Sequence, residues 1–141
     1  MRAARRGLAG GVLAAALGLS ACGSGGPAHD LFLVQRGGDI PGARLALRVT
    51  DDGRASCNRG PLVDITSAQL IAARELQRDL DPLAKRRFAL APGGGSVLRY
   101  RVVLEDGAVR FADDSRGQPP ALFRLAKLTR DVARGACGLA R

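Results

Sequence analysis

The chain has few side chains that could act as nucleophiles or metal ligands. It contains three cysteines, Cys22, Cys57 and Cys137, and one histidine, His29. His29 stands beside a Gly-rich stretch ahead of the first strand-like run, where a solvent-exposed linker residue is expected. Neither a Ser-His-Asp triad nor a zinc site built on imidazoles is therefore indicated.

Two pairs of adjacent carboxylates, Asp51-Asp52 and Asp113-Asp114, are the other candidates for chemistry. Paired carboxylates can serve as general acid and base, or bind calcium. Neither pair has the spacing of an EF-hand, and both fall at predicted turns, where an Asp side chain bonds nearby backbone amides. We expect turn formation, with a hydrolase that uses these carboxylates as the alternative.

Glycine-rich stretches occur at Gly37-Gly38 and at residues 93–95. Neither joins a strand to a helix with the spacing of a phosphate-binding loop, so both are expected to be ordinary loops. These patterns predict a protein without catalytic residues, metal or cofactor.

The amino-terminal residues have the organisation of a secretory signal peptide. Residues 1–6 hold three arginines and no acid, and residues 7–19 are only Gly, Ala, Val and Leu. Small residues follow at the expected cleavage point. The apolar run is shorter than the roughly 20 residues that a membrane-spanning helix needs.

The segment Leu19-Ser20-Ala21-Cys22 resembles the lipobox of bacterial lipoproteins, and the precursor resembles small actinobacterial lipoproteins with no assigned activity. The resemblance implies that residues 1–21 are removed and that the Cys22 thiol carries diacylglyceryl (palmitate-type) chains. The protein would then be anchored on the extracytoplasmic face of the cell membrane. Residues 22–30 would form a flexible tether and residues 31–141 a single domain. The alternative is an ordinary signal with an incidental cysteine.

If Cys22 carries lipid, Cys57 and Cys137 remain as an even pair. Exported proteins fold in oxidising compartments, so a Cys57–Cys137 disulfide is expected, with two unpaired thiols as the alternative.

The net charge favours anionic partners. The chain has a formal charge of +9, from 22 basic and 13 acidic residues. Removal of the three arginines of residues 1–6 leaves 19 basic residues and a charge of +6. Phospholipid headgroups, acidic wall polymers or an acidic protein face would suit this charge, whereas nucleic acid is not expected outside the cytoplasm. The alternative is a solvated Arg-rich surface that reflects a GC-rich genome.

Hydrophobic periodicity predicts strands at residues 31–35, 44–50, 54–58, 97–104 and 108–112. Helices are predicted from about residue 67 to 80, capped by Thr66 or Ser67, and after Pro120 to about residue 133. Pro82 is expected to end the regular part of the first helix. The order is strand, strand, short strand, helix, strand, strand, helix. It predicts an α+β fold in which an antiparallel sheet of two hairpins, with four or five strands, carries both helices on one face.

Alternation within two of these strands places arginines on the face away from the core. They are Arg44, Arg48, Arg99 and Arg101. If the two strands are neighbours, the four side chains would form a basic patch for an acidic lipid or polymer, the alternative being an ordinary solvated sheet face.

The domain from Leu31 to Val132 also resembles emfourin, a protein inhibitor of thermolysin-like metalloproteases. The likeness rests on an opening strand that ends in Arg36-Gly37-Gly38 with Gly42 soon after, and on a mid-chain helix. It continues in the strand from Tyr100 to Leu104, the Asp106-Gly107 turn towards Phe111, and a last helix after Pro120. The resemblance implies a contact region at Arg36, Gly37, Gly38 and Gly42.

The expected function is that of a membrane-anchored envelope lipoprotein with a non-catalytic binding role. Its partner would be an envelope protein, a protease or an anionic surface component. The alternative is an emfourin-like inhibitor of a metalloprotease.

Overall fold

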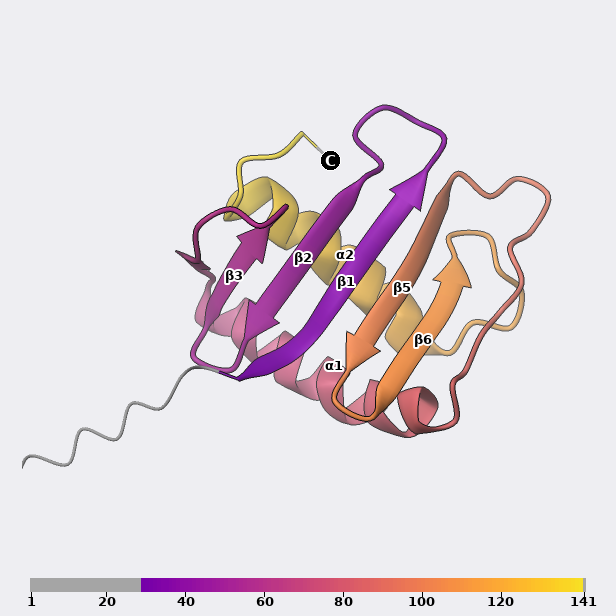
Figure 1. Cartoon of the computed structure of the whole chain (residues 1–141), viewed down its shortest axis with the longest axis horizontal. Coiled ribbons are helices and arrows are strands. Elements are labelled where there is room, and N and C mark those ends of the chain that lie inside the picture. The colour runs from indigo at the N-terminus through magenta and orange to yellow at the C-terminus, as the bar shows by residue number, and fades with distance from the viewer. Residues whose placement is uncertain (1–28, 141) are drawn as a thin grey trace, which may run out of the picture.

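The computed structural model describes residues 29–140, which form one antiparallel sheet with two helices on one of its faces (Figure 1). The strands are β1 (Asp30–Gly38), β2 (Leu45–Thr50), β3 (Arg54–Cys57), β4 (Val63–Asp64), β5 (Leu98–Leu104) and β6 (Gly107–Ala112). The helices are α1 (Ser67–Lys85) and α2 (Pro120–Gly135). The expected α+β class is confirmed, with six strands in the order β4-β3-β2-β1-β5-β6.

Alternation along the strands separates a buried face from an open one. In β2, Leu47 and Val49 are fully buried, while Arg48 between them is exposed. In β5, Tyr100 and Val102 are buried while Arg99 is exposed. This inner face packs on the helices, and within residues 29–140 no helix covers the opposite face of the sheet (Figure 1).

Helix α1 begins where the sequence predicts and ends later. Thr66 caps it: the Gln69 amide donates to Thr66 Oγ1 at 3.2 Å, and the Thr66 amide donates to Gln69 Oε1 at 2.9 Å. The predicted end near residue 80 is wrong, because the helix continues through Pro82 to Lys85. Pro82 lies in the last turn, and the fully buried Ala84 that follows it anchors that turn in the core.

The loop between β5 and β6 packs on this same turn of α1. A Cβ atom at Gly107 would lie 2.3 Å from the Ala84 carbonyl oxygen. Only glycine allows so close an approach, so the end of α1 and the second hairpin depend on each other.

Helix α2 carries the predicted apolar stripe and lies beside α1. Leu122, Leu125 and Val132 are fully buried. Arg124 Nη2 lies 2.5 Å from Asp79 Oδ2 of α1. Pro120 occupies the first turn, where a missing amide hydrogen has no cost, and Gly135 is the last helical residue.

Both sheet edges are short or covered. The two-residue strand β4 forms one edge and was not predicted, because two residues show no periodicity. At the other edge, Ala89 forms a parallel bridge with Arg110. The Leu90 amide donates to the Arg110 carbonyl at 2.9 Å, and the Arg110 amide donates to the Phe88 carbonyl at 3.0 Å. These contacts protect β6 from pairing with another chain.

Strand β1 begins at Asp30, one residue before the expected start of the domain, and runs to Gly38 rather than ending at residue 35. Gly37 and Gly38 pair with Arg99 and Leu98 of β5, so they belong to the sheet and the expectation of a loop is wrong. A Cβ atom at Gly38 would lie 2.0 Å from the Val97 carbonyl oxygen, which explains why glycine stands here.

Within residues 29–140, no helix combines the length and hydropathy that a membrane span needs.

Candidate functional site

Of the four arginines expected to form one patch, Arg48, Arg99 and Arg101 lie on the open side of the sheet, but on strands that are not neighbours. Strand β1 lies between β2 and β5. Adjacent strands are about 4.8 Å apart, so β2 and β5 are separated by roughly 10 Å. The condition for a single four-arginine cluster is therefore not met.

Two of these arginines have partners or neighbours elsewhere. Arg48 Nε lies 2.5 Å from Asp30 Oδ1, in an ion pair that offsets its charge. Arg44 precedes β2 and lines a separate hollow with Pro41 and Leu139. Neither arginine contributes to a cluster with β5.

Strands β5 and β6 carry a concentration of positive charge. Arg99 and Arg101 of β5 and Arg110 of β6 lie on the open face, and the two strands contain no acidic residue. Arg101 and Arg110 are directly opposite each other in the register of the hairpin. Arg101 Nη1 donates to Gln35 Oε1 at 3.0 Å, which orients its guanidinium. Arg99 has a long ion pair with Asp39, at 3.6 Å.

Arg110 was not among the residues singled out from the sequence, although a signal existed. Its neighbours Val109 and Phe111 were expected on the buried face, so alternation places Arg110 on the open one. What no sequence pattern indicated was its pairing with Arg101, because register depends on how the two strands meet.

Two hollows lie on this part of the sheet and share Arg101 and Arg110. One, of about 470 Å³, has Val103, Leu104, Gly107 and Ala108 in its walls and is bordered by Arg87 and Glu105. The other, of about 360 Å³, is lined by Ala89, Leu90 and Pro92 and bordered by Arg99. The arginine pair thus stands between two depressions with apolar walls and a mostly basic rim.

Arg87 lies just after α1 and borders the first of these hollows. Its φ of 53° lies in the left-handed region, where glycine or asparagine is more usual. Its amide donates to the Ala84 carbonyl at 2.8 Å and closes the end of the helix. An arginine in this conformation costs about 1 kcal/mol relative to an unstrained residue.

A depression on the helical side differs in charge. It lies between α1 and α2, with Leu76 and Leu128 in its floor, and has a volume of about 360 Å³. Its rim holds two carboxylates and two basic groups, from Glu75, Asp131, Arg124 and Lys127. Because these charges balance, this groove has no preference for a charged ligand.

The loop between β1 and β2, which was expected to contact a partner, is held by hydrogen bonds from the buried Arg36 side chain. This side chain is only 7% exposed. Its Nε donates to the Ala43 carbonyl at 2.9 Å and its Nη2 to the Gly42 carbonyl at 3.1 Å. Arg36 therefore shapes the loop between β1 and β2 and does not present its charge to the surface. Burial raises the pKa of the Tyr100 hydroxyl, against an opposing effect of the nearby Arg36 guanidinium.

The carboxylates of Asp113 and Asp114 fix the second glycine-rich loop. Asp114 accepts hydrogen bonds from the amides of Gly93 and Gly95 at 2.8 and 2.9 Å. Asp113 accepts one from the Val97 amide at 3.1 Å. Both side chains thus bond backbone amides of a distant segment, where sequence reasoning expected local turn contacts.

Asp51 and Asp52 serve the β2–β3 turn. Asp51 accepts a hydrogen bond from the His29 amide at 3.0 Å, which joins the start of the domain to this turn. Asp52 accepts hydrogen bonds from Arg54 Nε at 2.8 Å and Thr50 Oγ1 at 2.5 Å. These two hydrogen bonds, first that from Arg54, lower the pKa of the Asp52 carboxyl.

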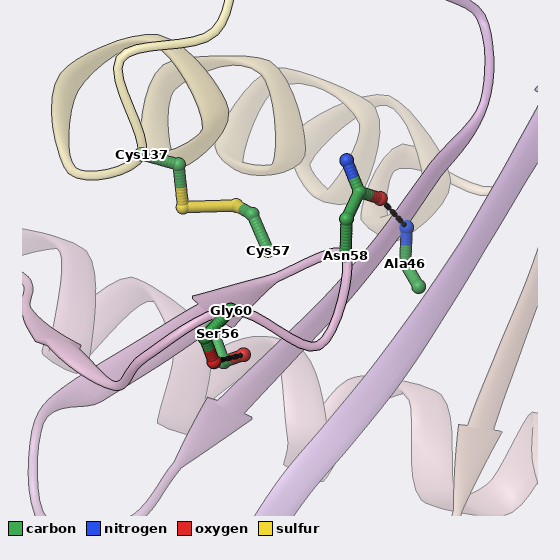
Figure 2. The surroundings of a disulfide bond; sticks show 6 residues. All are labelled: Ala46, Ser56, Cys57, Asn58, Gly60 and Cys137. Carbon is green, nitrogen blue, oxygen red and sulfur yellow. Dashed lines mark hydrogen bonds between the residues drawn. A yellow bond between two sulfur atoms is a disulfide. The ribbon is translucent and has the colours of Figure 1, made fainter.

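The expected Cys57–Cys137 disulfide is confirmed by the geometry of the two residues (Figure 2). The Sγ atoms are 2.10 Å apart, and the 6.2 Å between the Cα atoms lies within the usual range for a disulfide. The bond links the end of β3 to the segment after α2.

A turn of left-handed residues positions Cys57 for this bond. Asn58 and Arg59 have φ values of 53° and 62°, and the Gly60 amide donates to the Cys57 carbonyl at 2.9 Å. Asn58 Oδ1 accepts from the Ala46 amide at 2.9 Å (Figure 2). The Asn58 amide donates back to the Ala46 carbonyl at 2.8 Å. Asparagine suits this conformation because its short side chain can bond locally.

Among residues 29–140, no group of three or more His, Cys, Asp or Glu side chains is placed to hold a metal ion. Cys22, the expected signal peptide and residues 22–28 of the expected tether lie outside the described residues.

Comparison of the chain with protein-family models, with curated proteins and with solved structures finds no match.

Proposed function

We propose that this protein is an exported lipoprotein, anchored through lipid on Cys22, whose domain binds an anionic envelope component without catalysing a reaction. The binding surface is the β5–β6 half of the open sheet face. We call this surface the basic face and define it by Arg87, Arg99, Arg101 and Arg110.

The opposed pair of Arg101 and Arg110 carries the proposal. Like charges directly across a sheet destabilise it, and neither guanidinium has an ion pair within residues 29–140. Arg99 and Arg87 add charge on either side, and among the described residues Glu105 is the single acid in the walls of the two hollows. An anionic partner would neutralise this repulsion, which gives the basic face a reason to bind one.

The non-catalytic part of the proposal is supported by the use of the candidate chemical groups. Cys57 and Cys137 are bonded to each other. The carboxylates of Asp113 and Asp114 accept hydrogen bonds from backbone amides, and that of Asp52 from Arg54 and Thr50. A hydrolase built on the aspartate pairs would have to disrupt the loops that these groups hold.

The anchor is tested by expressing the full chain and its Cys22→Ala variant in an actinobacterial host fed an alkyne-bearing fatty acid. We expect label on the unchanged chain, loss of label in the variant, and a mass that shows cleavage before Cys22. An unlabelled, uncleaved chain in the soluble fraction would refute the anchored location.

The binding role is tested with the mature chain, residues 22–141 carrying Cys22→Ser, on isolated envelopes at increasing salt. Retention should fall as salt rises, and should fall further in Arg101→Gln/Arg110→Gln. A matched variant, Arg78→Gln/Arg134→Gln, removes two exposed charges from the helices. Equal retention of the two variants would contradict a role for the basic face.

One observation favours the second candidate, inhibition of a metalloprotease. The loop that runs from Gly37 to Gly42 is held in one shape by the two Arg36 hydrogen bonds, and Gly42 has a φ of 75°. Loops that enter an active site bind better when they are fixed beforehand, since less conformational entropy is lost.

This candidate is tested by titrating a thermolysin-like protease with the same mature chain. Inhibition that is lost when Pro41-Gly42 is replaced by Ala-Ala, and kept in Arg101→Gln/Arg110→Gln, would establish it. Unchanged protease activity at large molar excess would exclude that protease as its target.

A further inference from the structure

We propose that Arg101 and Arg110 form a site for the phosphate group of anionic phospholipids, so that the open sheet face lies on the membrane that holds the anchor. This inference rests on the proposed function and names the partner of the basic face.

The register of the β5–β6 hairpin brings the Arg101 and Arg110 side chains together as one site. As direct cross-strand partners on one face, their Cα atoms lie about 5 Å apart, so that both side chains can reach a single phosphate. A planar guanidinium offers paired N–H donors that match phosphate oxygens. The hydrogen bond from Arg101 to Gln35 Oε1 restrains one of the two in advance.

The surroundings of the pair suit a lipid better than a small free anion. The hollow on one side is walled by Ala89, Leu90 and Pro92, beside Arg99. The hollow on the other side has Val103 and Ala108 in its walls, beside Arg87. A phosphate held between the arginines would place the glycerol and ester part of a lipid over apolar surface, which a free phosphate ion would leave uncovered.

The tether limits where the domain can go. Seven residues lie between Cys22 and the first strand, and the extended chain from Cys22 to Asp30 spans at most about 28 Å. Arg101 lies opposite Gln35, five residues along β1 from Asp30, so the basic face is about 17 Å along that strand. Lipid headgroups are therefore within reach of the site at all times, and the tether raises their effective concentration.

The shape of the fold allows this orientation. The two helices cover the far face of the sheet, and β5 and β6 present the near one (Figure 1). The face carries no acidic residue within β5 or β6 that would repel an anionic membrane.

The test uses the mature chain carrying Cys22→Ser, which binds vesicles only through the domain. Sedimentation with vesicles of 30% phosphatidylglycerol in phosphatidylcholine should show salt-sensitive binding, with none to phosphatidylcholine alone. Arg101→Gln/Arg110→Gln should weaken binding about 30-fold. Each basic group near such a surface raises the affinity by a factor of about five to six, and the variant removes two of them. Arg78→Gln/Arg134→Gln should weaken it less than threefold.

Two further variants separate the site from charge and from folding. Arg101→Lys/Arg110→Lys keeps the charge but loses the paired N–H donors. If both guanidinium groups hydrogen-bond one phosphate, binding should still fall several-fold. Arg87→Gly relieves a left-handed residue and so should not lower the unfolding midpoint, yet it should weaken binding. Binding that is equal in all of these variants would overturn the site.

A second arm identifies the source of the phosphate. Soluble polyphosphate replaces vesicles in the same set of variants. Site-dependent binding to this polymer, with no vesicle binding, would overturn the membrane inference and leave the proposed function standing. Absence of binding to both would overturn the inference and count against the basic face as an anion-binding surface.

Discussion

Cys57 and Cys137 are separated by 80 positions in the chain, yet their Cα atoms lie 6.2 Å apart. The bond closes a loop that contains α1, β4, β5, β6 and α2, which is most of the domain. Because Cys57 ends β3 and Cys137 follows α2, the disulfide holds the end of β3 to the segment after the last helix.

We expect Cys57→Ala/Cys137→Ala to lower the free energy of unfolding by about 4 kcal/mol, because a long loop is no longer closed in the unfolded chain. Urea denaturation of the mature chain, with and without reductant, measures this. Cys22→Ser leaves the bond intact and is the control. An unchanged urea midpoint on reduction would show that the bond does not restrain the unfolded chain.

Gly107→Ala should destabilise the domain by about 2 kcal/mol, because its Cβ would meet the Ala84 carbonyl oxygen and its φ of 154° disfavours a side chain. Thermal or urea unfolding measures the loss. Gly94→Ala is a matched control, since a Cβ there would meet nothing within 4 Å. Equal stability of the two variants would contradict the close packing of the second hairpin on α1.

Arg36→Met should lower the free energy of unfolding by about 2 kcal/mol, because the Gly42 and Ala43 carbonyls lose a charged donor while the aliphatic stem remains. Amide exchange of residues 39–43 should quicken in the same variant. Arg44→Met, at an exposed position before β2, should change stability by less than about 0.5 kcal/mol. Unaltered exchange in the loop would show that Arg36 does not hold it.

Asp52 provides a test of pH dependence. Its pKa in the folded protein lies below the ordinary 3.8, so the folded state binds fewer protons than the unfolded state in acid. The stability that Asp52 contributes is therefore present above about pH 4 and is lost as the pH falls through the lowered pKa.

A carbon-detected NMR titration of the Asp52 carboxyl gives this pKa directly. In Arg54→Gln it should rise towards 3.8, because the hydrogen bond from Arg54 is the main cause of the shift. Arg59→Gln removes an arginine beyond the opposite end of β3 and should leave the titration unchanged. A pKa that stays low without Arg54 would assign the effect to Thr50.

Local patterns were enough to predict most of the secondary structure. Leu45, Leu47 and Val49 alternate with Ala46 and Arg48, and the alternation alone separates their buried face from the face of Arg48. The Thr66 cap and the apolar spacing of α1 are equally local. Such features follow from the geometry of one strand or one helix, which repeats every two or 3.6 residues.

The same patterns failed where a distant contact overrode them. Gly37 and Gly38 resemble the start of a loop, but β5 pairs with them and keeps them in the sheet. Pro82 resembles a helix end, but the packing of Ala84 continues the helix for a further turn. The contact that overrides the local pattern comes from β5 in the first case and from Gly107, which packs on Ala84, in the second. Both lie more than twenty residues away in the chain.

The features of the candidate site also fall into those that follow from local patterns and those that depend on distant contacts. The amino-acid sequence alone is enough to place Arg99, Arg101 and Arg110 outside the core, since each position follows from alternation within its strand. It also determined which two cysteines could pair once Cys22 is assigned to lipid.

Three further features depend on how the folded domain is assembled: β1 separates β2 from β5, Arg101 faces Arg110, and Arg36 turns inward to hold a loop. The physical reason is that strand order and register arise from pairing between distant segments. Their free energy depends on which backbone and core surfaces meet, and no single segment contains that information.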